Sequence, residues 1–158
     1  MRSIHSDQGY DHDRKYSLWR RNAFKQKVGR TDLYCADIDW VEWRTGQPVD
    51  LTECRRAIGV IKDAEAAVEH FKNLNNGFQY ELIACLSYRL PIPAYIVGIE
   101  DPNVDNSTLK DYPNARFVVE RIIPPDSWPG GRNNLSAIRS ELVGKMDEEQ
   151  YIHFIANL

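Results

Sequence analysis

The residues best placed to do chemistry in this 158-residue chain are carboxylates inside apolar, strand-like segments. Asp37 and Asp39 lie in DLYCADIDWVEWR (residues 32–44), and Glu53 lies in PVDLTECRR (residues 48–56). A carboxylate in a buried strand needs a partner, because burial of an unpaired charge is costly. Closely spaced carboxylates, together with phosphate oxygens, are ligands that Mg²⁺ prefers. The pattern therefore indicates divalent-cation chemistry.

The spacing predicts that two of these acids face each other. If residues 45–47 form a three-residue loop, the two segments make a hairpin in which Asp39 lies opposite Glu53. Opposed residues of an antiparallel pair share a face with Cβ atoms about 5 Å apart, so like charges there repel unless a cation lies between them. Arg55, two residues after Glu53, is expected on the same face, where it could grip a phosphate.

A second interpretation of the same acids is structural. They could lie on a solvent-exposed strand face, paired with Arg44, Arg55 or Arg56. A register slip of one residue would also move Asp39 and Glu53 to opposite faces of the hairpin. Spacing alone leaves the cation site and the exposed face as alternatives.

The charge of the chain is unevenly distributed along its length. The net charge is −3, but residues 1–30 carry eight basic and three acidic side chains, whereas the other 128 residues carry 12 basic and 20 acidic ones. Such a basic segment with interleaved aromatic residues suits a nucleic acid backbone, although basic amphipathic helices have other uses. The net charge therefore excludes only a protein that is basic over its whole surface. The candidate nucleic-acid-binding residues are Arg14, Lys15, Arg20, Arg21, Lys25 and Lys27.

The elements that must position these residues follow from periodicity and turn signals. A helix is expected over 14–28, closed by Gly29, and the strand hairpin follows it. The order predicts a mixed α/β (α+β) domain around one small sheet. We expect Trp19 and Trp40 in the core, with stacking on nucleic acid bases as the alternative, and the three cysteines as small core residues without disulfides. Beyond the hairpin we expect helices over 64–74 and 78–90, strands over 93–100 and 115–123, and two closing helical stretches, the last capped by Asp147.

The segment DIDWVEWRTGQPVDLTECR resembles the PD-(D/E)xK nuclease superfamily, in its small bacterial and phage form. The later segments GFQYELIACLSYRLPIPAYIVGIE and MDEEQYIHFIANL are also similar, so the resemblance spans about residues 14–158. It implies the restriction-endonuclease-like fold, a central mixed sheet of about four strands flanked by helices. It also implies hydrolysis of phosphodiester bonds in DNA, or in structured nucleic acid, with Mg²⁺ or Mn²⁺.

Carried over to this chain, the resemblance assigns roles to individual residues. Asp39 and Glu53 would hold the metal, with Asp37 as the alternate first ligand and the Cys54 carbonyl as an extra one. Arg55 stands where the family has Lys; it can stabilise charge but cannot act as a general base. Gln79 is a candidate for the glutamine that some members place on the following helix. An inactive nuclease fold that binds nucleic acid or protein is the alternative.

The remaining expectations concern domains, location and partners. We expect a flexible leader over 1–13 and one nuclease-like domain over 14–158. The N-terminus lacks an apolar signal region, and no run approaches the roughly 18 apolar residues of a membrane helix. A cytoplasmic protein without a membrane partner is therefore expected, with DNA as the main partner and a homodimer as a further prediction.

Overall fold

The computed structural model describes residues 19, 22–23, 25–27, 29, 38–101, 114–128 and 134–158. The chain divides into two compact units, Met1–Asp37 and Ile38–Leu158, which are described separately. In the first unit, the described residues between 19 and 27 are helical, and the Gly29 amide donates to the Lys25 carbonyl at 3.0 Å. Gly29 has a φ of +71°, so it closes this helix as predicted. The division into residues 1–13 and 14–158 stays a prediction.

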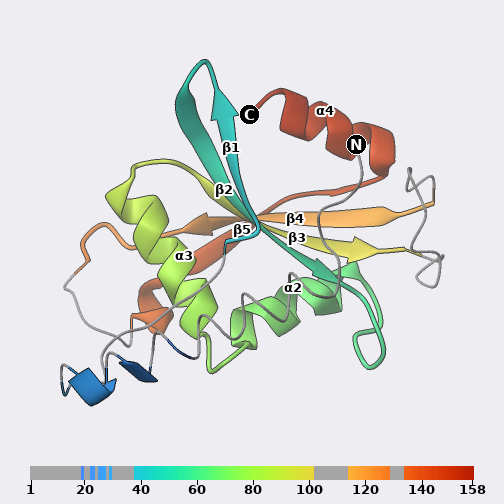
Figure 1. The fold of residues 1–158 in the computed structure, drawn as a ribbon. Helices are drawn as coiled ribbons and strands as arrows, with labels where there is room; N and C mark the ends of the chain where they lie inside the picture. Colours follow the sequence, from blue (N-terminus) through green and yellow to red (C-terminus); the bar gives the residue numbers. More distant parts are fainter. Residues whose placement is uncertain are drawn as a thin grey trace. The chain divides into compact units, whose positions relative to one another are not determined.

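The second unit is built around one mixed sheet (Figure 1). The strand order is β1-β2-β3-β4-β5, with β2 and β3 parallel and the other neighbours antiparallel. This confirms the mixed α/β (α+β) class. The elements are β1 (Trp40–Arg44), β2 (Gln47–Arg56), α2 (Ala64–Asn73), α3 (Phe78–Arg89), β3 (Ala94–Glu100), β4 (Arg116–Ile123), the 3₁₀ turn η1 (Leu135–Ala137), β5 (Arg139–Met146) and α4 (Glu148–Ala156).

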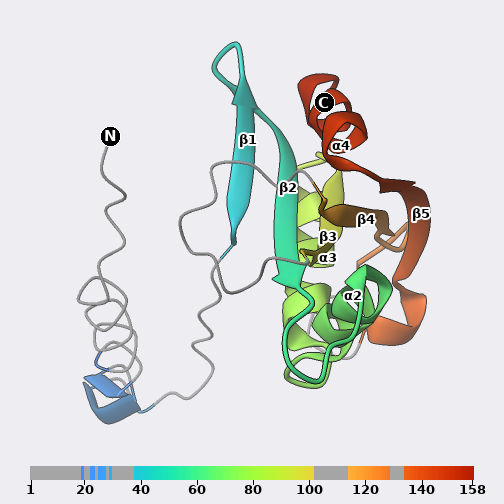
Figure 2. The ribbon, with the colours of Figure 1, turned by 90° about the vertical axis from the view of Figure 1, so that its right-hand side faces the viewer.

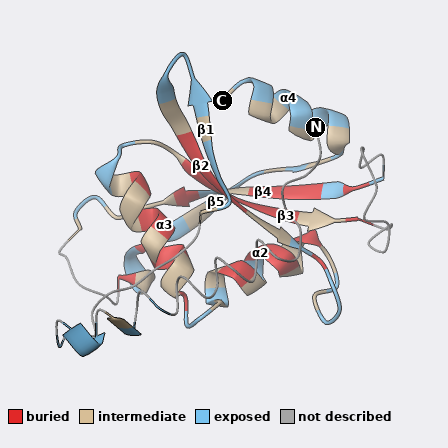
Figure 3. Cartoon of the chain, viewed as in Figure 1, coloured by how far each residue is buried: buried red, intermediate tan, exposed pale blue. Residues whose placement is uncertain are grey.

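Helices cover both faces of the sheet, α2 and α3 on one face and α4 on the other (Figure 2). One apolar cluster joins Leu51 and Ile96 to α2 and α3, and a second joins Val97 and Phe117 to α4. The central strand β3 is buried from Ala94 to Gly98 because both faces are covered (Figure 3). The side chains of β2 therefore alternate between the face covered by α2 and α3 and the face covered by α4.

Local sequence explains the positions of α2 and α3. The Asp63 side chain accepts a hydrogen bond from the Ala66 amide at 2.7 Å and caps α2. Asn75 and Asn76, which follow the expected end of the helix at residue 74, have positive φ values of 51° and 57°. α2 crosses closely over β3 at Gly98, where any Cβ would overlap the Ala64 carbonyl. The absence of a side chain at Gly98 therefore allows α2 to lie close to β3, the strand that pairs with β2.

The last part of the fold differs from the expectation of two helical stretches. The first is only the short turn η1, and the segment RSELVGKM forms β5. Its Glu, Leu, Lys and Met favour helix, but pairing along the open edge of β4 overrides that weak preference. The sheet consequently has five strands rather than about four. Asp147 caps α4 as predicted: its side chain accepts a hydrogen bond from the Gln150 amide, and its own amide donates to the Gln150 side chain.

The prediction that the two tryptophans lie in the core is wrong. Trp19 and Trp40 are 61% and 53% exposed, because Trp40 lies on the edge strand β1. Cys54 packs against the second apolar cluster, and Cys54 and Cys85 are free thiols, as predicted. Cys35 lies outside the described residues. Within the described ranges, no helix has the length and apolarity needed to cross a membrane.

Candidate active site

The hairpin that carries the predicted acids has a tighter turn than expected. Thr45 and Gly46 have φ values of 49° and 79°, as in the two-residue turns whose twist suits a hairpin. Arg44 therefore pairs with Gln47, and the prediction of a three-residue loop is wrong. A bulge at Val49 restores the expected register, so Trp40 pairs with Thr52.

Asp39 and Glu53 come together at the open end of this hairpin. The Asp39 carboxylate accepts a hydrogen bond from the Cys54 amide at 2.8 Å. The Glu53 carboxylate lies 3.4 Å from the Asp39 amide, which donates to it. Each acid is thus oriented by the backbone at or beside the other acid. Asp39 is exposed in a bend just before β1, whereas Glu53 is only 3% exposed in β2.

The burial of Glu53 bears on the structural interpretation, in which the acids lie on a solvent-exposed strand face. An exposed strand face would leave Glu53 in water, but its side chain lies inside the protein. Arg44 pairs with Glu42 rather than with either predicted acid, at 3.0 Å. The exposed-face alternative therefore does not hold for Glu53.

Alternation along β2 separates its side chains onto two faces. Leu51, Glu53 and Arg55 share the face covered by α2 and α3, because Leu51 packs in their cluster. Asp50, Thr52 and Cys54 share the opposite face, toward α4. Arg55 is half-buried and lies two residues from Glu53 on its face, as expected.

The Cys54 side chain does not belong to the acid pair. It lines a pocket on the α4 face, although its amide contacts Asp39. Burial, and then the charges of Asp39 and Glu53, raise the pKa of the Cys54 thiol to about 12. The thiol is therefore protonated at neutral pH when no metal is bound. The resemblance assigned the ligand role to the Cys54 carbonyl, and that role stays a prediction.

A second acid pair, Glu42 and Asp50, was missed by the sequence argument. These residues are directly opposite in the antiparallel ladder. The register that predicts Asp39 opposite Glu53 also places Glu42 opposite Asp50, so the signal was present. Asp50 is fully buried; its Oδ1 accepts a hydrogen bond from Thr52 at 2.8 Å. Its Oδ2 has no hydrogen-bond partner among the described residues.

Burial dominates the electrostatics of this second pair. It raises the pKa of Asp50 above the ordinary 3.8, and the charge of Glu42 acts in the same direction. The Thr52 hydrogen bond and the charge of Arg44 act in the opposite direction. Arg44 also donates to the Ile155 carbonyl at 3.0 Å, which ties the hairpin to the end of α4.

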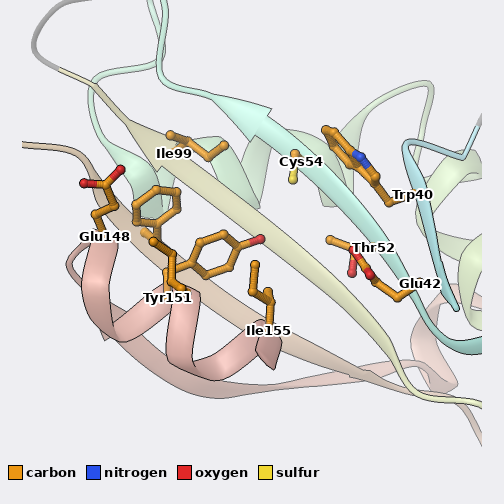
Figure 4. A pocket seen from close by; sticks show the side chains of 10 residues that line it. Trp40, Glu42, Thr52, Cys54, Ile99, Glu148, Tyr151 and Ile155 are labelled. Carbon is orange, nitrogen blue, oxygen red and sulfur yellow. The ribbon is translucent and has the colours of Figure 1, made fainter. Parts of the chain in front are cut away.

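A pocket of about 350 Å³ lies between this face of the hairpin and α4 (Figure 4). Its walls include Trp40, Ile99, Phe117 and Tyr151. Phe117 and Tyr151 stack with ring centroids 4.4 Å apart, which holds the Tyr151 ring in place. Burial raises the pKa of the Tyr151 hydroxyl well above its usual range, so the hydroxyl stays protonated.

The other predicted site residues are only partly placed. Gln79 is half-buried in the first turn of α3, and its role stays a prediction. Lys25 and Lys27 are exposed residues of the first unit. Nothing in the structure relates them to the acid pair, since the two units are not placed relative to one another. Five predicted residues lie outside the described ranges: Arg14, Lys15, Arg20, Arg21 and Asp37.

The two carboxylates of Asp39 and Glu53 suit a cation whose remaining ligands are water and phosphate oxygens. In the part of the chain that the structure describes, no three His, Cys, Asp or Glu residues are grouped to hold a metal ion. Mg²⁺ is commonly held by one or two carboxylates, with water and phosphate oxygens completing its shell. A carboxylate has about four acceptor sites, so the amide hydrogen bonds orient these groups without exhausting them. Two carboxylates therefore fit Mg²⁺ or Mn²⁺ in the presence of a phosphate.

Comparison with protein-family models, with curated proteins and with solved structures found no match for this chain. The nuclease resemblance consequently depends on the sequence motif alone. The arrangement of Asp39, Glu53 and Arg55 must be judged by its own geometry.

Proposed function

We propose that this protein is a metal-dependent nuclease that hydrolyses phosphodiester bonds in DNA or structured nucleic acid. The observation that carries the proposal is that Asp39 and Glu53 are neighbours at the end of the hairpin, each with its carboxylate on a backbone amide at or next to the other acid. The half-buried Arg55, on the same face as Glu53, supplies a fixed positive charge. We also propose that the protein acts in the cytoplasm, as expected from the sequence.

The residues of the chain have distinct tasks in this proposal. Asp39 and Glu53 would hold Mg²⁺ or Mn²⁺, which when bound polarises a phosphate oxygen and makes a coordinated water more acidic. Arg55 would stabilise the negative charge that develops on the phosphate, since a guanidinium can donate two parallel hydrogen bonds. Because Arg55 stays protonated, it takes no proton from the attacking water.

Basic residues of the first unit would bind the nucleic acid backbone. Lys25 and Lys27 are exposed, which suits phosphate contact. A net positive segment also offsets the repulsion that the acidic remainder of the chain exerts on DNA. A positively charged segment contacts phosphates without reading sequence, so the contribution of these lysines is to affinity rather than to specificity.

A cleavage assay tests the proposal. Plasmid and single-stranded DNA are incubated with the full chain and Mg²⁺ or Mn²⁺, and with EDTA as the metal-free control. We expect cleavage only with the divalent cation, and its loss in Asp39→Asn and Glu53→Gln. Glu141→Gln, an exposed acid on β5, is the matched control and should cleave like the parent. Cleavage that survives in both site variants would overturn the assignment.

The same samples test the alternative, an inactive fold that binds nucleic acid. That hypothesis gains support from Arg55, which stands where the resembled family has Lys. It predicts salt-sensitive retention on DNA without cleavage, weakened when Arg20, Arg21 and Lys25 are replaced by Gln. If the chain binds no nucleic acid at low salt, both hypotheses are wrong.

A further inference from the structure

The pocket between the hairpin and α4 is separate from the proposed nuclease site. Thr52 and Cys54 line it from β2, whereas Glu53 lies on the other face of that strand. The volume of the pocket, about 350 Å³, is within the range of small-molecule sites. The pocket therefore offers a second place for a ligand, and the nuclease proposal gives it no role.

Apolar and aromatic side chains make up most of the pocket wall. Ile99, Phe117 and Ile155 contribute from β3, β4 and α4. Trp40 and Tyr151 contribute aromatic rings from β1 and α4. The Phe117 and Tyr151 rings are nearly parallel, with an interplanar angle of 9° and centroids 4.4 Å apart. This part of the wall is thus held in place before a ligand arrives, which lowers the entropic cost of binding.

The two carboxylates at the ends of the pocket already have partners. Glu42 pairs with Arg44 at 3.0 Å, and Glu148 has a hydrogen-bond or electrostatic interaction of its own. Among the described residues, no Lys, Arg or His lines the pocket, so nothing there would attract an anion. Burial is the main cause of the raised pKa of the Tyr151 hydroxyl, and the charges of Asp50 and Glu42 add to it. The pocket therefore repels anions without offering an unpaired charge to a cation, which favours a neutral ligand.

The Tyr151 hydroxyl is a hydrogen-bond donor that lacks an acceptor. It is protonated at neutral pH, and none of the described residues accepts a hydrogen bond from it. Figure 4 shows this hydroxyl pointing into the pocket, toward the side chains of Thr52 and Ile155. The Thr52 hydroxyl already donates to Asp50 at 2.8 Å. An acceptor atom on a ligand would complete the hydrogen bonding of Tyr151 inside an otherwise apolar space.

We propose that this pocket binds a neutral aromatic molecule that carries one hydrogen-bond acceptor, such as an aryl ketone. The carbonyl oxygen of the ligand accepts a hydrogen bond from the Tyr151 hydroxyl, and its ring packs against Trp40 and Phe117. Burial of the ring supplies most of the affinity, and the hydrogen bond selects for the acceptor. The proposal does not depend on nuclease activity, because the two sites use opposite faces of β2.

A ligand series of constant ring size tests the charge of the ligand. Acetylnaphthalene is titrated into the full chain beside naphthoate and naphthylethylammonium, and binding is followed by NMR shifts of the backbone amides and of the Trp40 indole, which lines the pocket. We expect the neutral ketone to bind at least about tenfold more tightly than either ion, because an ion loses its hydration in an apolar site. Absence of binding by the ketone, or equal affinity for one of the ions, would overturn the proposal.

A matched pair of variants tests the hydrogen bond from Tyr151. Tyr151→Phe removes the hydroxyl from the pocket, whereas Tyr95→Phe makes the same change in the same apolar cluster, outside the lining. We expect acetylnaphthalene to bind about fivefold more weakly to Tyr151→Phe, and ethylnaphthalene, which has no acceptor, to bind equally to all three proteins. Thermal unfolding confirms that both variants fold. An unchanged affinity of the ketone for Tyr151→Phe, or an equal loss in Tyr95→Phe, would refute the site.

Discussion

The two acid pairs of the β1–β2 hairpin have the same register but very different surroundings. At the open end, Asp39 and Glu53 each accept a hydrogen bond from a backbone amide. Nearer the turn, Asp50 is fully buried, and one of its oxygens has no hydrogen-bond partner among the described residues. The spacing in the sequence is the same for the two pairs. The hydrogen bonds from backbone amides distinguish them, because they are present at the first pair.

This difference indicates what each pair can do. Amide donors orient the carboxylates of the first pair, which suits a cation site. The second pair instead buries a carboxylate that has one oxygen without a hydrogen-bond partner among the described residues, which lowers folding stability.

The largest expected effect comes from breaking the first pair. Asp39→Asn and Glu53→Gln should each slow DNA cleavage by about 100-fold or more, because each removes a charged ligand of one cation. The double variant should be barely slower than either single variant, since the two acids act as one unit.

Single-turnover cleavage rates for the parent, the two single variants and the double variant measure this coupling. Thermal unfolding of the same samples controls for misfolding. Fully additive losses would contradict a shared cation, because they would mean that the two carboxylates act independently.

A smaller effect on cleavage is expected at Arg55, which lies on the same face of β2 as Glu53. Arg55→Ala should reduce cleavage by about tenfold, through loss of charge stabilisation on the phosphate. Arg55→Lys should recover most of that loss, since it keeps the positive charge. Steady-state cleavage rates distinguish these outcomes, and an Arg55→Ala variant as active as the parent would exclude a role for this residue.

The second pair is tested through stability rather than activity. Asp50→Asn should stabilise the protein by about 1 kcal/mol at neutral pH, because it replaces a buried charge by a neutral amide. The raised pKa of Asp50 means that the folded chain holds this proton to higher pH than the unfolded chain. The stability of the parent therefore falls, relative to the variant, as pH rises from 3.8 through the folded pKa.

Urea unfolding across this pH range measures the difference between parent and variant. The advantage of Asp50→Asn should be largest at neutral pH and should disappear below the ordinary pKa of 3.8. An advantage that is independent of pH would mean that the charge of Asp50 is not what costs stability.

The smallest expected change is in Glu42→Gln. It relieves repulsion with Asp50 but also removes the half-exposed ion pair with Arg44, so the two effects largely offset each other. The free energy of unfolding should change by less than about 0.5 kcal/mol. Chemical denaturation at neutral pH checks this value, and a change several times larger would mean that the balance between the two contacts has been misjudged.

The sequence predicted the elements well where one strong signal dominates. The helix expected over 78–90 is α3, Asp147 caps α4, and the strand expected over 93–100 is the buried strand β3. It failed for β5, because the pairing that makes RSELVGKM a strand comes from β4 and not from the segment itself.

The sequence predicted which acids of the hairpin are neighbours, but not which hydrogen-bond partners surround them. The spacing of Asp39 and Glu53 indicated their convergence, even though a shorter turn and a bulge at Val49 produce it. Spacing could not show that Asp50 lacks a complete set of partners, because this depends on Thr52 and Arg44. Nor could it show the pocket, whose walls come from five separate elements.

Direct cation binding tests the central claim that Asp39 and Glu53 form a divalent-metal site. Mn²⁺ is titrated into the full chain, and its free form is measured by electron paramagnetic resonance, without substrate and with a short DNA duplex. We predict one Mn²⁺ site per chain, tighter with DNA, that is lost in Asp39→Asn and in Glu53→Gln and is retained in Glu141→Gln. Mn²⁺ binding that is unchanged in the two site variants, or absent from the parent with DNA present, would contradict it.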